Sequence, residues 1–193
     1  ISDNSGGISA DVARHYAFRF GRSKDFAGVR RSVGQFGVGM KRAIFKIGRA
    51  FSVESKFRAG DGAADSQFTL KVDVEEWATL PDWTFQFESV DESTPLDDAD
   101  TAGTTISVTK LHPSVAADLE DPAIIKALRT ELRIRHQESI QNGLRLILND
   151  EQPLAASRPA LQASEAVTPL VRHLEIPGPD GGSVDVKLYA GTI

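Results

Sequence analysis

The chain has 193 residues, of which 40% are hydrophobic and 25% charged, and it contains 16 Gly and 9 Pro. This composition is typical of one globular domain, or of one domain with part of a second, and argues against a disordered tail. No apolar run approaches the roughly 18 residues of a membrane-spanning helix, so no membrane span is expected. The absence of cysteine excludes disulfides, thiolate metal sites and cysteine nucleophiles, and it fits a cytoplasmic protein.

The net charge of −5 is distributed unevenly along the chain. Residues 1–58 carry 12 Lys and Arg against 4 Asp and Glu, whereas residues 59–193 carry 10 against 23. A basic first third favours contact with an anionic partner, although a solvated helix surface would give the same pattern.

Both ends of the chain have the character of β-strands. Residues 1–3 stand directly before a Gly-rich turn, and residues 184–190 alternate between apolar and polar side chains. We therefore expect the sequence to be an excerpt cut from a longer protein at both ends.

Two helices are predicted in the first 50 residues, separated by a polar, basic loop over residues 21–32. The first covers residues 8–20, with Ser9 as its N-terminal cap. The second covers residues 38–48 and stops at a glycine. The apolar face of the first helix is formed by residues at helical spacing, namely Ile8, Val12, Tyr16 and Phe20.

Alternating runs of apolar and polar residues follow, separated by Gly, Pro or acidic turn segments. They cover residues 50–57, 67–74, 83–90 and 104–111. Beyond them we expect a helix over residues 122–141, a strand over 144–148, a linker over 152–169, and a hairpin formed by residues 174–176 and 184–190. This order predicts an α+β fold with helices on one face of a mostly antiparallel sheet.

Residues 34–39, with the sequence Gly-Gln-Phe-Gly-Val-Gly, open the second predicted helix. The exposed N–H groups of such a turn and the positive end of the helix dipole favour a phosphate group. Lys41 and Arg42 lie in the first helical turn, where cations are unfavourable unless an anion is bound. A tight turn that needs glycine only for its backbone is the alternative, and the sequence is neither a Walker loop nor a Rossmann fingerprint.

Two further segments could contact a base. Asp3 stands on a turn before Gly6 and Gly7, where its carboxylate could accept a hydrogen bond from an exocyclic amine while the glycines let a flat ring approach. A simple turn residue is the alternative for Asp3. Thr104 follows Gly103 at a strand start, a pairing too common to indicate a function alone.

Together the three segments resemble the motifs of the GHKL ATPase superfamily, which includes the ATPase chain of DNA gyrase, the ninety-kilodalton heat-shock chaperone, sensor histidine kinases and MutL. Gly-x-x-Gly-x-Gly begins 27 residues after Gly7, and Gly103-Thr104 follows. The sequence is most similar to bacterial MORC-like or chaperone-like members over residues 1–111, and more loosely over 112–150. The resemblance implies the Bergerat fold, a two-layer α/β sandwich that holds ATP between its helices and its sheet.

The resemblance also implies roles for individual residues. Asp3 would bond the adenine amino group, with Gly7 beside the base and Thr104 in the same hydrogen-bond network. Residues 9–33 would form an ATP lid. Lys41 would contact a phosphate, or else be a solvated helix residue. Phosphate contacts would come from the second motif, through Gly34, Gly37, Val38 and Gly39.

The sequence departs from the family in two respects. Ser5 occupies the place of the first glycine of the usual Asp-x-Gly-x-Gly motif. The Glu that activates water and the Asn that holds Mg²⁺ belong to a helix upstream of the first motif. We therefore expect this chain to hydrolyse ATP negligibly by itself.

Two functional hypotheses follow from these observations. In the first, residues 1–142 bind ATP or ADP and residues 143–193 begin a β-rich transducer region, so that nucleotide operates a conformational switch with slow hydrolysis in the intact parent. An ATP-dependent homodimer and a nucleic-acid or protein client are then expected, but no membrane partner. In the second, the fold is a nucleotide-independent interaction domain whose basic first third binds nucleic acid or an acidic partner.

Overall fold

The computed structural model describes residues 1–19, 39–60, 64–82, 84–97, 102–156, 163, 167–178 and 181–191. The chain divides into two compact units, Ile1–Glu120 and Asp121–Ile193. Gly34, Gly37, Val38 and the predicted basic loop over residues 21–32 lie outside the described residues.

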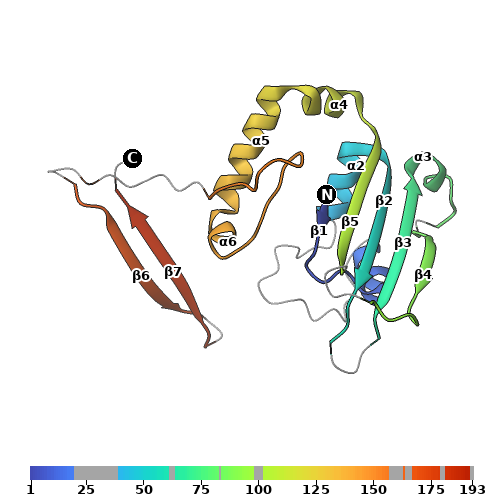
Figure 1. Cartoon of the computed structure of the whole chain (residues 1–193), viewed down its shortest axis with the longest axis horizontal. Helices are drawn as coiled ribbons and strands as arrows, with labels where there is room; N and C mark the ends of the chain where they lie inside the picture. The colour runs from blue at the N-terminus through green and yellow to red at the C-terminus, as the bar shows by residue number, and fades with distance from the viewer. Residues whose placement is uncertain are drawn as a thin grey trace. The chain divides into compact units, whose positions relative to one another are not determined.

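The first unit is built on an antiparallel sheet, which has five strands in the described part of the chain (Figure 1). Their spatial order is β1-β5-β2-β3-β4. The alternation of the sequence matches the burial on the sheet: in β2 the side chains of Phe51, Val53 and Ser55 are buried, and those between them are not. The strands are β1 (Ser2–Asp3), β2 (Gly48–Phe57), β3 (Ser66–Asp73), β4 (Phe87–Asp91) and β5 (Gly103–Leu111).

Helices α1 (Ala10–Val12), η1 (Ala13–Ala17) and α2 (Gly39–Ile47) cover one face of this sheet (Figure 1). The short helix α3 (Val74–Trp77) follows β3, and α4 (Pro113–Glu120) follows β5. The core between the layers is rich in aromatic rings, with Phe18 edge-on to Phe68 and Phe85 at centroid distances of 6.1 Å. This arrangement confirms the predicted α+β fold, a two-layer sandwich with helices on one face.

The first helix differs from its prediction in the face that it buries. Ser9 does cap it, since the Val12 N–H donates to Ser9 Oγ at 3.2 Å. Val12, however, is 42% exposed, whereas Ala10 and Ala13 are fully buried. Helical geometry starts only at Ala10, and the turn then widens into a π-helix. The inward face therefore follows small alanines, which let the helix approach the sheet closely.

Two predicted strand boundaries were also wrong. Residues 84–86 are not in β4, which begins at Phe87. Residue 74, placed in a strand by its alternation, begins α3 instead. The cause is local, because the Asp73 carboxylate caps this helix by accepting from the N–H groups of Glu75 and Glu76.

The second unit contains α5 (Pro122–Arg135), α6 (Gln137–Gln141), β6 (Leu170–Pro177) and β7 (Ser183–Ala190). The predicted helix over residues 122–141 breaks at His136, and the predicted hairpin is present as the pairing of β6 with β7. The strand predicted over residues 144–148 is absent. This segment has no ladder with a neighbouring strand, although Leu154 N–H donates to Leu146 O at 2.7 Å.

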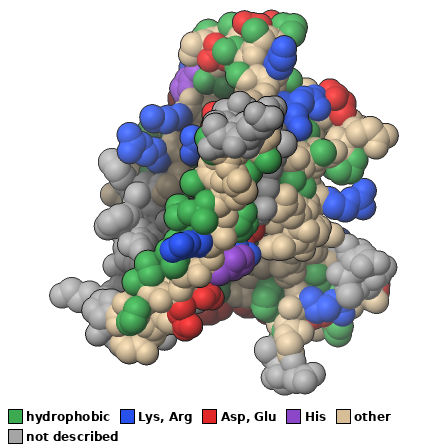
Figure 2. Space-filling view, turned by 90° about the vertical axis from the view of Figure 1, so that its left-hand side faces the viewer, with side chains coloured by type: hydrophobic (Ala, Val, Ile, Leu, Met, Phe, Trp, Pro, Cys, Tyr) green, Lys and Arg blue, Asp and Glu red, His purple; other side chains and the backbone are tan. Residues whose placement is uncertain are grey.

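The hairpin exposes hydrophobic side chains on both of its strands. Figure 2 shows hydrophobic side chains interspersed with charged ones on one face of the molecule. No helix among the described residues has the length and apolar character needed to cross a membrane. The exposed hydrophobic residues of the hairpin are Leu170, Val171, Leu174, Ile176, Val184, Leu188 and Tyr189.

Candidate nucleotide site

The first and third sequence motifs meet at one edge of the sheet. In the antiparallel pairing of β1 with β5, Asp3 lies directly opposite Thr104. Directly opposite residues project from the same face of a sheet, so the carboxylate and the hydroxyl are neighbours. The next pair, Ser2 and Thr105, is joined by a 2.9 Å hydrogen bond between the hydroxyl groups. The structure thus brings together Asp3 and Thr104, as the resemblance implied.

Glycines make this close approach possible. A Cβ added at Gly103 would lie only 2.0 Å from the carbonyl oxygen of Asp3. A Cβ added at Gly7 would lie 2.1 Å from the carbonyl oxygen of Lys56, and Gly7 has a φ of +76°. Both positions therefore require glycine because the backbone of another segment occupies the space of a side chain.

The side chain of Asp3 is exposed and held by the turn that follows it. Its Oδ1 accepts hydrogen bonds from the Ser5 N–H at 2.9 Å and from the Ser5 hydroxyl. Both bonds end on Oδ1, so Oδ2 is the oxygen that could accept from an amine of a ligand. Ser5, at the position where the family motif has glycine, is thus in direct contact with the carboxylate.

Ser55 is a site residue that the sequence analysis missed. Its side chain lies in β2, directly opposite Thr104 of β5, and the two hydroxyl oxygens are 3.2 Å apart. The Ile8 N–H donates to Ser55 Oγ at 2.7 Å, so this hydroxyl joins the first motif to the third. A signal was present, because Ser55 is the polar member of a strand face that otherwise carries apolar side chains.

Lys41 lies in the first turn of α2 and is buried, with 3% of its surface exposed. Its Nζ donates to the carbonyl oxygen of Ala17 at 2.8 Å, at the end of η1. Burial lowers the pKa of the Lys41 ammonium below its usual value. The solvated position considered from the sequence is therefore wrong, and contact with phosphate stays a prediction. Gly39, at the start of the same helix, has open space where a Cβ would stand.

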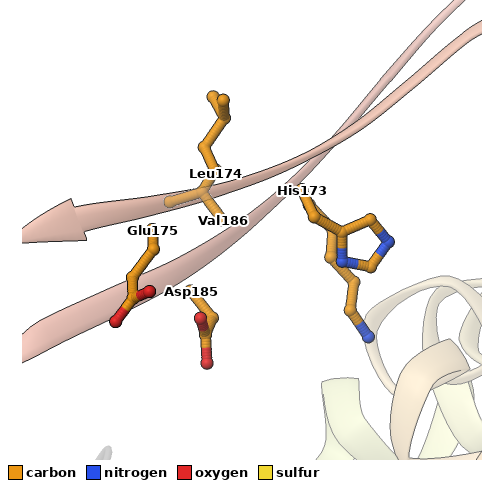
Figure 3. A pocket seen from close by; sticks show the side chains of 6 residues that line it. His173, Leu174, Glu175, Asp185 and Val186 are labelled. Carbon is orange, nitrogen blue, oxygen red and sulfur yellow. The ribbon is translucent and has the colours of Figure 1, made fainter.

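A separate hollow lies on the hairpin of the second unit. It is lined by residues of β6 and β7, and Figure 3 shows His173, Glu175 and Asp185 on the opposite side of the hairpin from Leu174. Glu175 and Asp185 are paired directly across the strands. Two adjacent carboxylates repel a phosphate group, so this hollow is a poor candidate for the nucleotide site.

The two-layer sandwich, the turn that carries Asp3 and the glycine-lined contact with Thr104 define an ATP-binding domain of the Bergerat class. A family model described as histidine kinase-, DNA gyrase B- and HSP90-like ATPase matches residues 1–103, more than half of the chain. The chain belongs to this family, which supports ATP binding at the level of the family. None of the curated proteins compared with the chain matches it.

Membership also implies Mg²⁺ together with ATP or ADP. Among the residues that the structure describes, no group of three or more His, Asp or Glu side chains could hold a metal ion. The described donors therefore do not fit a metal site, whereas the carboxylate of Asp3 and the hydroxyl of Thr104 fit the edge of a base.

Proposed function

We propose that this chain binds ATP and ADP with the adenine ring at Asp3 and Thr104. The observation that carries the proposal is the register of β1 and β5, which places these two side chains directly opposite each other. The exocyclic amine of adenine would donate to the free oxygen of the Asp3 carboxylate. Gly6 and Gly7, both with positive φ, leave the adjoining backbone without a side chain.

We further propose that nucleotide binding operates a conformational switch, with slow ATP hydrolysis in the intact protein. In this proposal residues 143–193 start a transducer-like region, and the nucleotide-bound form of the parent pairs as a homodimer. Lys41 supports a coupling of this kind, because one buried ammonium connects the first turn of α2 to the end of η1. No metal ligand is assigned to the described residues.

Calorimetric titration of ADP into the folded chain tests the site. Asp3→Asn presents an amide instead of a full carboxylate to the base, so we expect about a tenfold to hundredfold loss of affinity, the range for a hydrogen bond to a charged group. Asp11→Asn, an equal change of charge on the adjacent helix α1, should bind ADP like the unmodified chain.

Circular dichroism must show that each variant is folded. A folded, unmodified chain that does not bind ADP would overturn the proposal, and so would Asp3→Asn binding with unchanged affinity.

A further inference from the structure

Ser55 has an unusually crowded hydroxyl for a residue in the middle of a sheet. The side chain is 3% exposed, and four polar atoms lie within hydrogen-bond distance of its Oγ. They are Ile8 N at 2.7 Å, Ile8 O at 3.2 Å, Gly103 O at 3.3 Å and Thr104 Oγ1 at 3.2 Å.

A hydroxyl cannot satisfy all four of these atoms. It has one hydrogen to donate and two lone pairs to accept with, and the Ile8 N–H occupies one lone pair. Its single hydrogen must then choose among three oxygens. If Ser55 donates to Thr104, the hydrogen of Thr104 is released to point elsewhere. If Ser55 donates to a carbonyl, its second lone pair can accept the hydrogen of Thr104 and keep it inside the sheet.

We propose that Ser55 is a positioning residue that donates to Thr104 Oγ1 and thereby turns the Thr104 hydrogen toward the bound base. This inference rests on the proposed nucleotide site. Asp3, Thr104 and Ser55 form one row across β1, β5 and β2, so Thr104 is the middle member between the exposed carboxylate and the buried hydroxyl.

The consequence is selectivity between purines. The edge of adenine carries an amine that donates and an N1 that accepts, whereas hypoxanthine carries a carbonyl that accepts and an N1–H that donates. Asp3 can only accept when it is ionised, which suits the amine of adenine. A Thr104 hydrogen held toward the ligand complements N1 of adenine, directly or through a water molecule, and lacks this partner at N1–H of hypoxanthine.

The test uses Ser55→Thr and Ser55→Val, which have nearly the same shape and differ by one hydroxyl. Affinities for ADP and IDP are measured by calorimetry, and melting temperatures are recorded in parallel. We expect Ser55→Val to bind ADP about three- to tenfold more weakly than Ser55→Thr, the range for one neutral hydrogen bond, with a much smaller change for IDP. Ser55→Ala provides the same comparison with the unmodified chain if the added methyl groups disturb folding.

A double-mutant cycle with Thr104→Val assigns the effect to this contact, because the loss from Ser55→Val should disappear when Thr104 has no hydroxyl. Equal losses for ADP and IDP, or a loss that persists in the Thr104→Val background, would show a merely structural role and overturn the inference. An unmodified chain that binds ADP while Ser55→Val and Ser55→Ala keep its purine preference overturns this inference alone. A folded, unmodified chain that binds neither nucleotide overturns the proposed function as well.

Discussion

Asp3 and Thr104 lie directly opposite each other in the pairing of β1 with β5, although 101 residues separate them in the sequence. The pair is continued by Ser55 of β2, which lies opposite Thr104 on the other side of β5. Three strands therefore contribute one polar side chain each to a single row. The carboxylate at one end is exposed and the hydroxyl at the other is buried, so the row runs from solvent into the core.

The contact between β1 and β5 should fail when a side chain is added at Gly103. A Cβ at this position would lie 2.0 Å from the carbonyl oxygen of Asp3, and backbone atoms cannot give way as the end of a flexible side chain can. We expect Gly103→Ala to lower the free energy of unfolding by about 1–3 kcal/mol, typical of overpacking, and to weaken ADP binding at least about tenfold. Urea denaturation and calorimetric titration measure the two effects.

Gly60→Ala is the matched control for Gly103→Ala, since an added Cβ there meets no atom within 4 Å. A Gly103→Ala variant with unchanged stability and affinity would show that β1 does not need its close approach to β5.

Lys41 should make stability depend on pH in the alkaline range. Because burial lowers its pKa in the folded protein, the unfolded chain keeps the Lys41 proton to a higher pH than the folded chain does. Unfolding then takes up a proton, and the free energy of unfolding gains a contribution that grows as the pH rises toward 10.5. Relative to Lys41→Met, the unmodified chain should become more stable between pH 7 and roughly pH 10.

Urea denaturation at several pH values gives this difference, with Lys46→Met, an exposed position in the same helix, as the control. A difference between the unmodified chain and Lys41→Met that stays constant with pH would contradict the expectation.

Asp65 should make stability sensitive to acid. Its two oxygens accept from the N–H groups of Leu96 at 2.7 Å and Ala59 at 2.9 Å, which ties two loops together. These bonds, with a smaller contribution from the Arg58 charge, lower the pKa of the Asp65 carboxyl. Its stabilisation is therefore present above the ordinary pKa of 3.8 and is lost as the pH falls through the lower folded value.

We expect Asp65→Asn to be less stable than the unmodified chain at pH 7, and the gap between them to shrink below about pH 4. Chemical denaturation at both pH values measures the gap, and Asp118→Asn in α4 provides an exposed control. A gap that is equally large in acid would show that the charge of Asp65 has no part in holding the loops.

Much of the fold could be predicted from the period of its apolar residues. Alternation located most of β2, β3 and β5, and the glycine after Ile47 located the end of α2. The wrong boundaries have local or long-range causes that a period does not contain. Val74 continues the alternation of β3, yet the Asp73 cap turns the chain into α3. Residues 144–148 have strand composition but no partner strand to form a ladder.

The site was predictable only in part. Asp3 and Thr104 were indicated by the order of the motifs, but their register depends on pairing over a long separation that no local pattern encodes. Ser55 looked like an ordinary polar residue of a strand, because its importance comes from the atoms that surround it. Lys41 looked solvated or phosphate-bound from its place in a first turn, since its contact with Ala17 requires the packed helices.

The row of Asp3, Thr104 and Ser55 also has a consequence for folding. Ser55 and Thr104 are 49 residues apart, and the chain between them must already have formed β3 and β4 for the sheet to be complete. Contacts between such distant residues form late, after most of the loop entropy has been lost. The base can therefore recognise only a domain that is fully assembled. A bound nucleotide should slow amide hydrogen exchange in β1, β2 and β5 together, as one cooperative unit rather than as a local loop.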